Sequence, residues 1–218
     1  MATDDILVPA TYNAPFLNYR KPAMNNDEYL KQLRKDLVIQ ETLCGQPLTF
    51  HSTWGIFSPR EIDEGTRLLL EYVEISDDAD VFDLGCGYGP IGITLAKLAP
   101  KGKTLMVDKD FMAVEYANKN VQLNRLNNAE AKLSNAFDHV GDRQFDVVIS
   151  NVPAKVGKEM MTLILNDAYK YLRPGGQIYV VTINGLRDYM KRNFKEIFGN
   201  YEKLKQGKNY TVAKAVKE

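Results

Sequence analysis

Short apolar runs alternate with amphipathic stretches from about residue 80 to the end of the chain. Runs of about four to eight apolar residues are typical of buried strands, whereas apolar positions that recur every three to four residues are typical of helices. The pattern predicts strands near Val81–Leu84, Thr104–Asp108, Ala131–Leu133, Phe145–Ser150 and Gln177–Thr182. It predicts helices near Ile91–Ala99, Met112–Leu123, Gly157–Leu172 and Leu186–Phe198. This alternation indicates a doubly wound α/β fold, in which helices cover both faces of a mostly parallel sheet.

Residues 1–47 follow a different pattern, and we expect them to form an N-terminal arm and helix. Proline recurs through the first 22 residues, which is typical of an extended arm. Residues 25–40 predict a helix, because Leu30, Leu33, Leu37 and Val38 would share one of its faces. Gly45-Gln46-Pro47 should end that helix.

We expect residues 48–218 to form the main domain. Its first part predicts a strand or hairpin over residues 48–58 and a helix over residues 61–73 that covers one edge of the sheet. Residues 209–216 predict a final strand.

The strand near Val81–Leu84 carries an acid and runs directly into a glycine-rich turn. Its sequence is Asp83-Leu84-Gly85-Cys86-Gly87-Tyr88-Gly89-Pro90. Alternating glycines let a backbone bend tightly and approach a bound molecule without obstruction by a Cβ atom. Pro90 suits the first position of a helix, where the amide has no intrahelical acceptor. The stretch from Asp83 to Gly89 is therefore expected to bind a cofactor, with Asp83, Gly85, Cys86, Gly87 and Gly89 in contact with it.

The residues leave two cofactors open. Asp108 ends the next strand, where its carboxylate can accept hydrogen bonds from the ribose hydroxyls of either NAD or S-adenosylmethionine. Gly87, Gly89 and Gly92 satisfy a dinucleotide fingerprint, which keeps a nicotinamide oxidoreductase as an alternative. Pro90 argues against it, because a pyrophosphate binds through the amides of a helix N-terminus and proline lacks one. S-adenosylmethionine has no phosphate and does not need that amide.

A second group of interest follows the strand near Phe145–Ser150. That strand ends in Asn151-Val152-Pro153-Ala154. Because ligands of open parallel sheets lie beyond the carboxyl ends of the strands, Asn151 should lie beside the cofactor, where a second substrate must meet it.

Together these motifs resemble class I S-adenosylmethionine-dependent methyltransferases. The series comprises Asp83 with its glycines, Asp108, Ser134-Asn135-Ala136-Phe137 and Asn151-x-Pro153. It looks closest to the methyltransferase small-domain family, which includes guanine-N2 methyltransferases of ribosomal RNA and short archaeal relatives. The resemblance implies a Rossmann-like sheet of about seven strands, with the last one antiparallel beside the fifth. It also implies S-adenosylmethionine as the cofactor.

The resemblance assigns further residues to the cofactor site. Trp54-Gly55-Ile56-Phe57-Ser58 looks like a family loop, in which Phe57 and Ser58 would line the cofactor entrance. Lys109 would lie near the adenine ring. Asn135, followed by Ala136, stands where the family usually has an acid that contacts the adenine amino group, and an Asn oxygen can also accept that hydrogen bond.

The catalytic residues implied are Asn151, Val152 and Pro153. An exocyclic amine is a poor nucleophile because its lone pair is delocalised into the ring. The side-chain oxygen of Asn151 and the backbone carbonyl of Val152 can accept both amine hydrogens and hold the nitrogen in attacking geometry. Pro153 would fix the backbone so that both acceptors point correctly.

Val152 and Ala154 depart from the family's usual Asn-Pro-Pro followed by an aromatic or apolar residue. Without a ring at position 154 a flipped adenine has nothing to clamp it. For this reason, and because the family that the chain resembles includes guanine-N2 methyltransferases, we expect guanine-N2 of RNA as the target. Two other possibilities remain open, namely methylation of a protein glutamine amide and a binding module without turnover.

Charge is distributed unevenly, although the formal net charge is zero. Residues 1–150 carry 15 Lys and Arg against 22 Asp and Glu, whereas residues 151–218 carry 13 against 6. The basic second half is expected to attract the phosphates of ribosomal or transfer RNA.

Composition limits the remaining possibilities. Only two cysteines, Cys44 and Cys86, are present, so no disulfide framework is expected and a reduced cytoplasmic setting fits best. We expect no signal peptide, no membrane span and no metal site, since His51 and His139 stand alone. A monomer or homodimer is expected.

Overall fold

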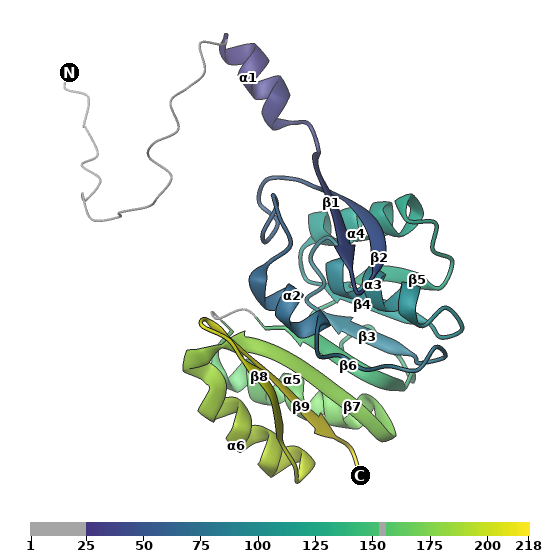
Figure 1. The fold of residues 1–218 in the computed structure, drawn as a ribbon, viewed down its shortest axis with the longest axis vertical. Coiled ribbons are helices and arrows are strands. Elements are labelled where there is room, and N and C mark those ends of the chain that lie inside the picture. The colour runs from purple at the N-terminus through teal and green to yellow at the C-terminus, as the bar shows by residue number, and fades with distance from the viewer. Residues whose placement is uncertain (1–24, 153–155) are drawn as a thin grey trace, which may run out of the picture. The chain divides into compact units, whose positions relative to one another are not determined.

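The computed structural model describes residues 25–152 and 156–218 (Figure 1). The described residues 25–35 belong to a unit separate from residues 36–218, and they contain helix α1 (Asn26–Leu33). The side chain of Asn25 caps this helix by accepting a hydrogen bond from the Asp27 amide at 2.8 Å.

The helix predicted over residues 25–40 is wrong in its second half. Residues Leu37–Leu43 form strand β1, which pairs antiparallel with β2 (Gln46–Ser52). Cys44 and Gly45 both have positive φ, as a two-residue hairpin turn requires. Alternate residues Ile39 and Leu43 of β1 are buried. Val38, which the prediction placed on the apolar helix face, is exposed instead, because successive residues of a strand point to opposite sides.

The main sheet has seven strands in the order β5-β4-β3-β6-β7-β9-β8. Their bounds are β3 Val81–Leu84, β4 Thr104–Asp108, β5 Ala129–Leu133, β6 Phe145–Asn151, β7 Leu172–Ile183, β8 Glu202–Gln206 and β9 Tyr210–Val216. Strands β3 to β7 are parallel, and β9 runs antiparallel beside β7. The predicted doubly wound sheet and the placement of its last strand are confirmed. Strand β8 was not predicted, because its exposed, lysine-rich edge position gives it little apolar alternation.

Helices cover both faces of this sheet (Figure 1). Helices α2 (Glu64–Leu70), α3 (Pro90–Leu98) and α4 (Phe111–Leu123) belong to one hydrophobic core together with the β1–β2 hairpin. Helices α5 (Lys158–Tyr171) and α6 (Arg187–Phe198), the latter preceded by the short helix η1 (Asn184–Leu186), build the other. Successive residues of β3 serve the two cores, Val81 the first and Phe82 the second. Helix α2 packs on β7 and β9 rather than along an edge, which corrects our expectation for it.

The strand order reverses between β3 and β6, which are parallel neighbours. Their register pairs Asp83 with Ile149, so the glycine turn after β3 and Asn151 at the end of β6 lie at the same edge of the sheet. Open α/β sheets bind ligands at such a switch point. Within the described ranges, no helix is both long and apolar enough to cross a bilayer.

Candidate functional site

The glycine turn adopts the backbone that its sequence predicts. Gly85, Gly87 and Gly89 have φ values of +73°, +55° and +97°, a region that disfavours other residues. The amides of Gly85 and Cys86 both donate to the Val107 carbonyl, at 2.9 and 3.0 Å. A Cβ atom at Gly85 or Gly87 would meet nothing within 4 Å, so these two glycines border open space. Cys86, which was also expected to contact the cofactor, is a buried residue of the first hydrophobic core.

Asp83 lies fully buried beneath this turn. Its Oδ2 accepts a hydrogen bond from the Gly92 amide at 2.8 Å, while its Oδ1 has no hydrogen-bond partner among the described residues. Burial raises the pKa of Asp83 to about 7. Gly92 permits this contact, because a Cβ atom there would lie 2.4 Å from the Met106 side chain. The acid is thus held with one oxygen free to accept a proton or a cationic donor.

Asp108 connects the tips of β3 and β4. Its Oδ2 accepts from the Gly87 amide at 2.9 Å and its Oδ1 from the Asp110 amide at 3.0 Å. Asp108 is only half-buried and Lys109 is exposed. Asp110 caps α4 by accepting from the Met112 amide at 2.9 Å. The carboxylate of Asp108 therefore lies at the same sheet edge as the glycine turn. It keeps lone pairs that can accept hydrogen bonds from ribose hydroxyls.

Asn135 and Ala136 follow β5. The backbone joins this loop to the site, since the Ser134 amide donates to the Asp108 carbonyl at 2.9 Å. Ala136 has a φ of +50°, and the exposed Asn135 donates to Asp138 at 3.2 Å, so its amide oxygen stays available as an acceptor. The neighbouring Phe137 is core rather than site, because it stacks on Phe82 with ring centroids 4.5 Å apart.

A loop preceding α2 is tied to the glycine turn by Tyr88. The Tyr88 hydroxyl donates to the carbonyls of Ser58 and Glu61, which lie 3.2 and 3.1 Å away. Ser58 has a φ of +46°, and its side chain donates to Glu61 at 2.7 Å. The Phe57 ring is 66% exposed on this loop. The structure therefore brings the loop that carries Phe57 and Ser58 to the glycine turn.

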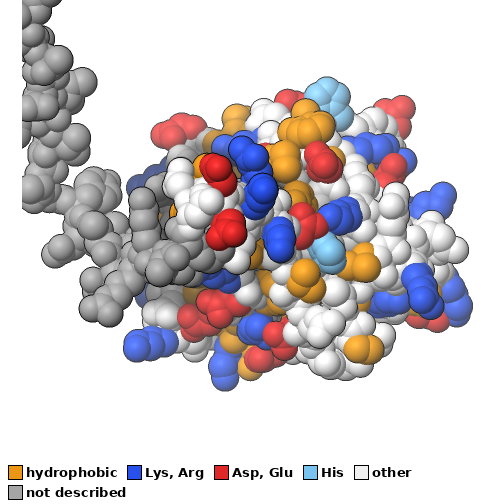
Figure 2. Space-filling model, turned by 90° about the horizontal axis from the view of Figure 1, so that it is seen from above, with side chains coloured by type: hydrophobic (Ala, Val, Ile, Leu, Met, Phe, Trp, Pro, Cys, Tyr) orange, Lys and Arg blue, Asp and Glu red, His pale blue; other side chains and the backbone are white. Residues whose placement is uncertain are grey.

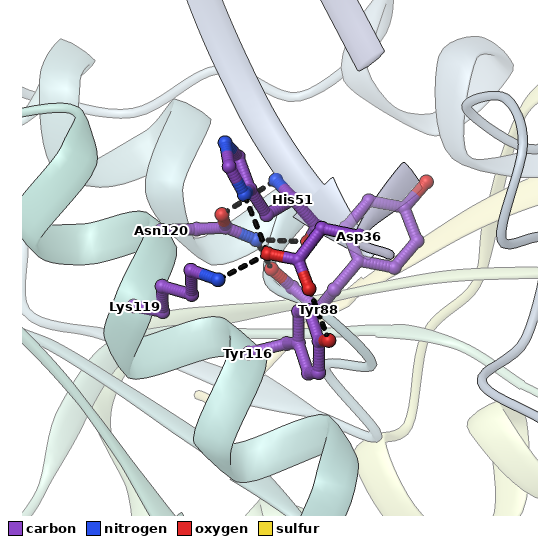
Figure 3. A network of polar contacts seen from close by, with 6 residues as sticks. All are labelled: Asp36, His51, Tyr88, Tyr116, Lys119 and Asn120. Atoms are coloured by element: carbon purple, nitrogen blue, oxygen red, sulfur yellow. Dashed lines mark hydrogen bonds and ion pairs between the residues drawn. The ribbon is translucent and has the colours of Figure 1, made fainter. Parts of the chain in front are cut away.

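Asn120, which sequence analysis missed, holds the turn from the other side (Figure 3). Its side-chain amide donates to the carbonyls of Tyr88 and His51 at 2.9 and 2.8 Å, and its oxygen accepts from the His51 amide at 2.7 Å. A buried Asn within an amphipathic helix gives little sequence signal beyond its place on the apolar face of α4.

The Asp36 carboxylate lies beside this contact and joins the hairpin to α4 (Figure 3). It accepts hydrogen bonds from Lys119, from the Tyr116 hydroxyl at 2.7 Å and, at the same distance, from the His51 ring. Burial opposes ionisation, but these three hydrogen bonds outweigh it and hold the pKa of Asp36 well below its usual value. The cluster stabilises the hairpin against the helix that carries Asn120.

Asn151 ends β6 with both hydrogens of its side-chain amide engaged. They are donated to Asp63 Oδ2 at 2.8 Å and to Thr66 Oγ1 at 3.0 Å. The Val152 amide donates to the Val181 carbonyl at 3.0 Å, which keeps the chain in the sheet beyond Asn151. Pro153, also predicted as catalytic, and Ala154 lie outside the described residues. Sequence analysis assigned Asp63 and Thr66 no role in the site.

No metal site was found in the part of the chain that the structure describes: no three His, Cys, Asp or Glu residues there are grouped to hold an ion. The predicted residues instead form two sets at one sheet edge. One set surrounds the glycine turn and Asp108, and the other is Asn151 with its two partners.

Comparisons with known proteins identify relatives over most of the chain. A family profile described as the methyltransferase small domain matches residues 47–214. An uncharacterized protein of Bacillus subtilis, YbxB, is 31% identical over 179 residues, which cover 80% of this chain and 89% of that protein. Ribosomal RNA large subunit methyltransferase G of Cronobacter sakazakii is 32% identical, over 80% of this chain and 48% of its own length.

Among solved structures, a T. thermophilus 16S rRNA N2 G1207 methyltransferase in complex with AdoMet and guanosine superposes with a TM-score of 0.77 and 28% identity. The match covers 84% of this chain and 51% of that one. The chain thus spans about half the length of the two named ribosomal RNA methyltransferases.

Proposed function

The chain belongs to the methyltransferase small-domain family, and from this premise we propose that it transfers a methyl group from S-adenosylmethionine to N2 of guanine in RNA. One observation carries the proposal: Asn151 at the end of β6 lies at the same sheet edge as the glycine turn after β3. Methyl transfer to nitrogen requires a group beside the cofactor that accepts hydrogen bonds from the amine, and Asn151 provides such a group beside the cofactor-binding turn.

The residues present fit S-adenosylmethionine. The buried Oδ1 of Asp83, which has no hydrogen-bond partner among the described residues, can accept from the cofactor's ammonium group, which would supply a counter-charge. Gly85 and Gly87 leave the space that a bound nucleoside would fill. Asp108 would accept from the ribose hydroxyls, and Asn135 and Lys109 would lie toward the adenine, with Phe57 and Ser58 at the entrance. The bound cofactor would supply a methyl group that its sulfonium activates.

The chain's own residues would position the amine that receives the methyl group. The Asn151 oxygen and the Val152 carbonyl would accept the two amine hydrogens, which holds the nitrogen lone pair toward the methyl carbon. The proton becomes acidic only as the nitrogen–carbon bond forms, so no strong base is required and solvent can take it.

Charge at the sheet edge supports an RNA substrate. Lys158 begins α5 after β6 and Lys208 lies in the turn before β9, whose Tyr210 pairs with Ile183 at the end of β7. Both lysines are exposed at the carboxyl edge that carries the site. The opposite edge carries Asp77, Asp78, Asp80 and Asp142 before the strands and Asp146 at the start of β6, and three of these acids form ion pairs there, Asp77 with Lys101 and Asp80 and Asp146 with Arg173. On the face drawn in Figure 2, basic and acidic side chains are interspersed, so phosphate attraction would come from local groups rather than from a whole basic face.

The experiment that tests this function is mass spectrometry of nucleosides from unmodified ribosomal RNA, incubated with the protein and labelled cofactor. Label in N2-methylguanosine is expected, with RNA affinity that falls as salt rises. Label only in protein glutamine would favour the second activity that an Asn-x-Pro motif suits. Calorimetric binding of NAD without binding of S-adenosylmethionine would reinstate the oxidoreductase alternative.

A further inference from the structure

The contacts of Asn151 identify a second group of residues that prepares the site for transfer. We propose that Asp63 and Thr66 are positioning residues: they bind the Asn151 amide nitrogen and so direct its oxygen at the acceptor amine. This inference rests on the proposed function of Asn151. Neither residue was singled out by its sequence.

An asparagine at a strand tip has two amide orientations that differ by a half-turn about χ2. Only one of them presents the oxygen to an amine. Asp63 Oδ2, 2.8 Å away, and Thr66 Oγ1, 3.0 Å away, both act as acceptors toward the Asn151 nitrogen. Because nitrogen and oxygen lie on opposite sides of the amide carbon, the oxygen must point away from α2. A carboxylate cannot donate, so the flipped orientation would set two oxygens against each other.

Asp63 is itself held in one position. Its Oδ2 also caps α2, accepting from the amides of Gly65 at 2.9 Å and Thr66 at 3.2 Å. Its Oδ1 accepts from the Tyr210 hydroxyl at 3.4 Å, which brings β9 into the same group. Gly65 is needed for this packing, because a Cβ there would lie 2.9 Å from Asp63 Oδ2 and 3.0 Å from the Tyr210 ring. The positioning group is thus fixed by rigid elements on three sides.

The carboxylate has a second effect. A hydrogen bond from the Asn151 N–H to an ionised acceptor polarises the amide and makes its oxygen a stronger acceptor. The amine hydrogens become more acidic during transfer, so their hydrogen bonds to the Asn151 oxygen strengthen in the transition state. The stronger acceptor should therefore increase the rate of transfer and leave cofactor binding unchanged.

The test compares Thr66→Val, which keeps shape and removes the hydroxyl, with Thr66→Ser, which restores an acceptor. Methyl transfer from saturating labelled S-adenosylmethionine to unmodified ribosomal RNA is measured for both, together with the dissociation constant of S-adenosylmethionine. We expect kcat to fall about 10- to 100-fold in Thr66→Val, as for a misoriented catalytic contact, with cofactor affinity within about twofold of wild type. Thr66→Ser should recover most of the rate.

Thr162→Val is the matched control, since the Thr162 hydroxyl contacts Lys158 and Tyr189 on the other face of the sheet. An unchanged kcat in Thr66→Val, or a loss that serine does not restore and that cofactor affinity shares, would overturn the proposal.

A readout without RNA separates this proposal from the function on which it rests. Both side-chain ¹⁵N–H signals of Asn151, assigned with Asn151→Asp, should be protected from solvent exchange in the wild type, and the one whose hydrogen is donated to Thr66 should lose protection in Thr66→Val. If the wild type transfers no methyl group but both Asn151 signals are protected, the proposed function is refuted and the positioning role is kept. Rapid exchange of these signals in the wild type would refute the positioning role.

Discussion

The strongest test of the buried acid at the base of the glycine turn is Asp83→Asn. The substitution keeps the shape of the side chain and an oxygen for the Gly92 amide, 2.8 Å from Asp83 Oδ2 in the wild type. It removes a carboxyl group that is fully buried and whose Oδ1 is unpartnered among the described residues. The variant should therefore be at least as stable as the wild type at alkaline pH in the absence of cofactor, although it loses a site residue.

The magnitude follows from the pKa. Burial raises the pKa of Asp83 from 3.8 to about 7, so the folded state holds this proton more tightly than the unfolded state does. The contribution of Asp83 to the free energy of unfolding is therefore complete below about pH 3.8. It decreases as the pH rises from 3.8 to about 7 and does not change further above about pH 7. At about 1.4 kcal/mol per pH unit, wild type should lose about 2 kcal/mol between about pH 5.5 and pH 8.5 relative to the variant.

Urea unfolding of both proteins at the two pH values measures this difference, and the other titrating groups cancel in the comparison. Asp110→Asn controls for removal of an exposed acid at the same edge. Calorimetry should show the opposite ranking for S-adenosylmethionine, which the variant binds more weakly because its amide cannot balance an ammonium charge. Parallel pH dependences for wild type and Asp83→Asn would refute the reasoning.

Three further variants test the remaining parts of the site and its packing. Asp108→Ala should weaken S-adenosylmethionine binding by about 2–4 kcal/mol, because two charge-assisted hydrogen bonds to the ribose are lost, and calorimetry would contradict this by showing unchanged affinity. Asn151→Ala should abolish transfer with cofactor affinity nearly unchanged, so activity within a few-fold of wild type would remove Asn151 from the mechanism. Gly92→Ala should destabilise the fold by about 1–3 kcal/mol in thermal or urea unfolding, since its Cβ would lie 2.4 Å from the Met106 side chain. A variant as stable as the wild type would show that the Met106 side chain can move away at no cost.

Sequence by itself determined the central architecture. Buried parallel strands are short apolar runs. Gly85 directly after β3 and Asn151 at the end of β6 lie at the carboxyl ends of the strands, where a doubly wound sheet binds its ligands. Local chemistry was sufficient there, because the positive φ of the glycines and the order of strands and helices are properties of neighbouring residues. Sequence failed where two periodicities coincide, as in β1, and where an edge strand is solvated, as in β8.

Only the tertiary structure decided how the site is held together. Asn151 lies 88 residues from Asp63 and 85 from Thr66, and Asn120 lies 32 from Tyr88. No periodicity links such residues, since hydrogen bonds between distant elements depend on how helices settle on the sheet. The same holds for Asp83: its place in a strand was visible in the sequence, but its raised pKa comes from complete burial, and only the structure shows that its Oδ1 has no partner in the described part of the chain.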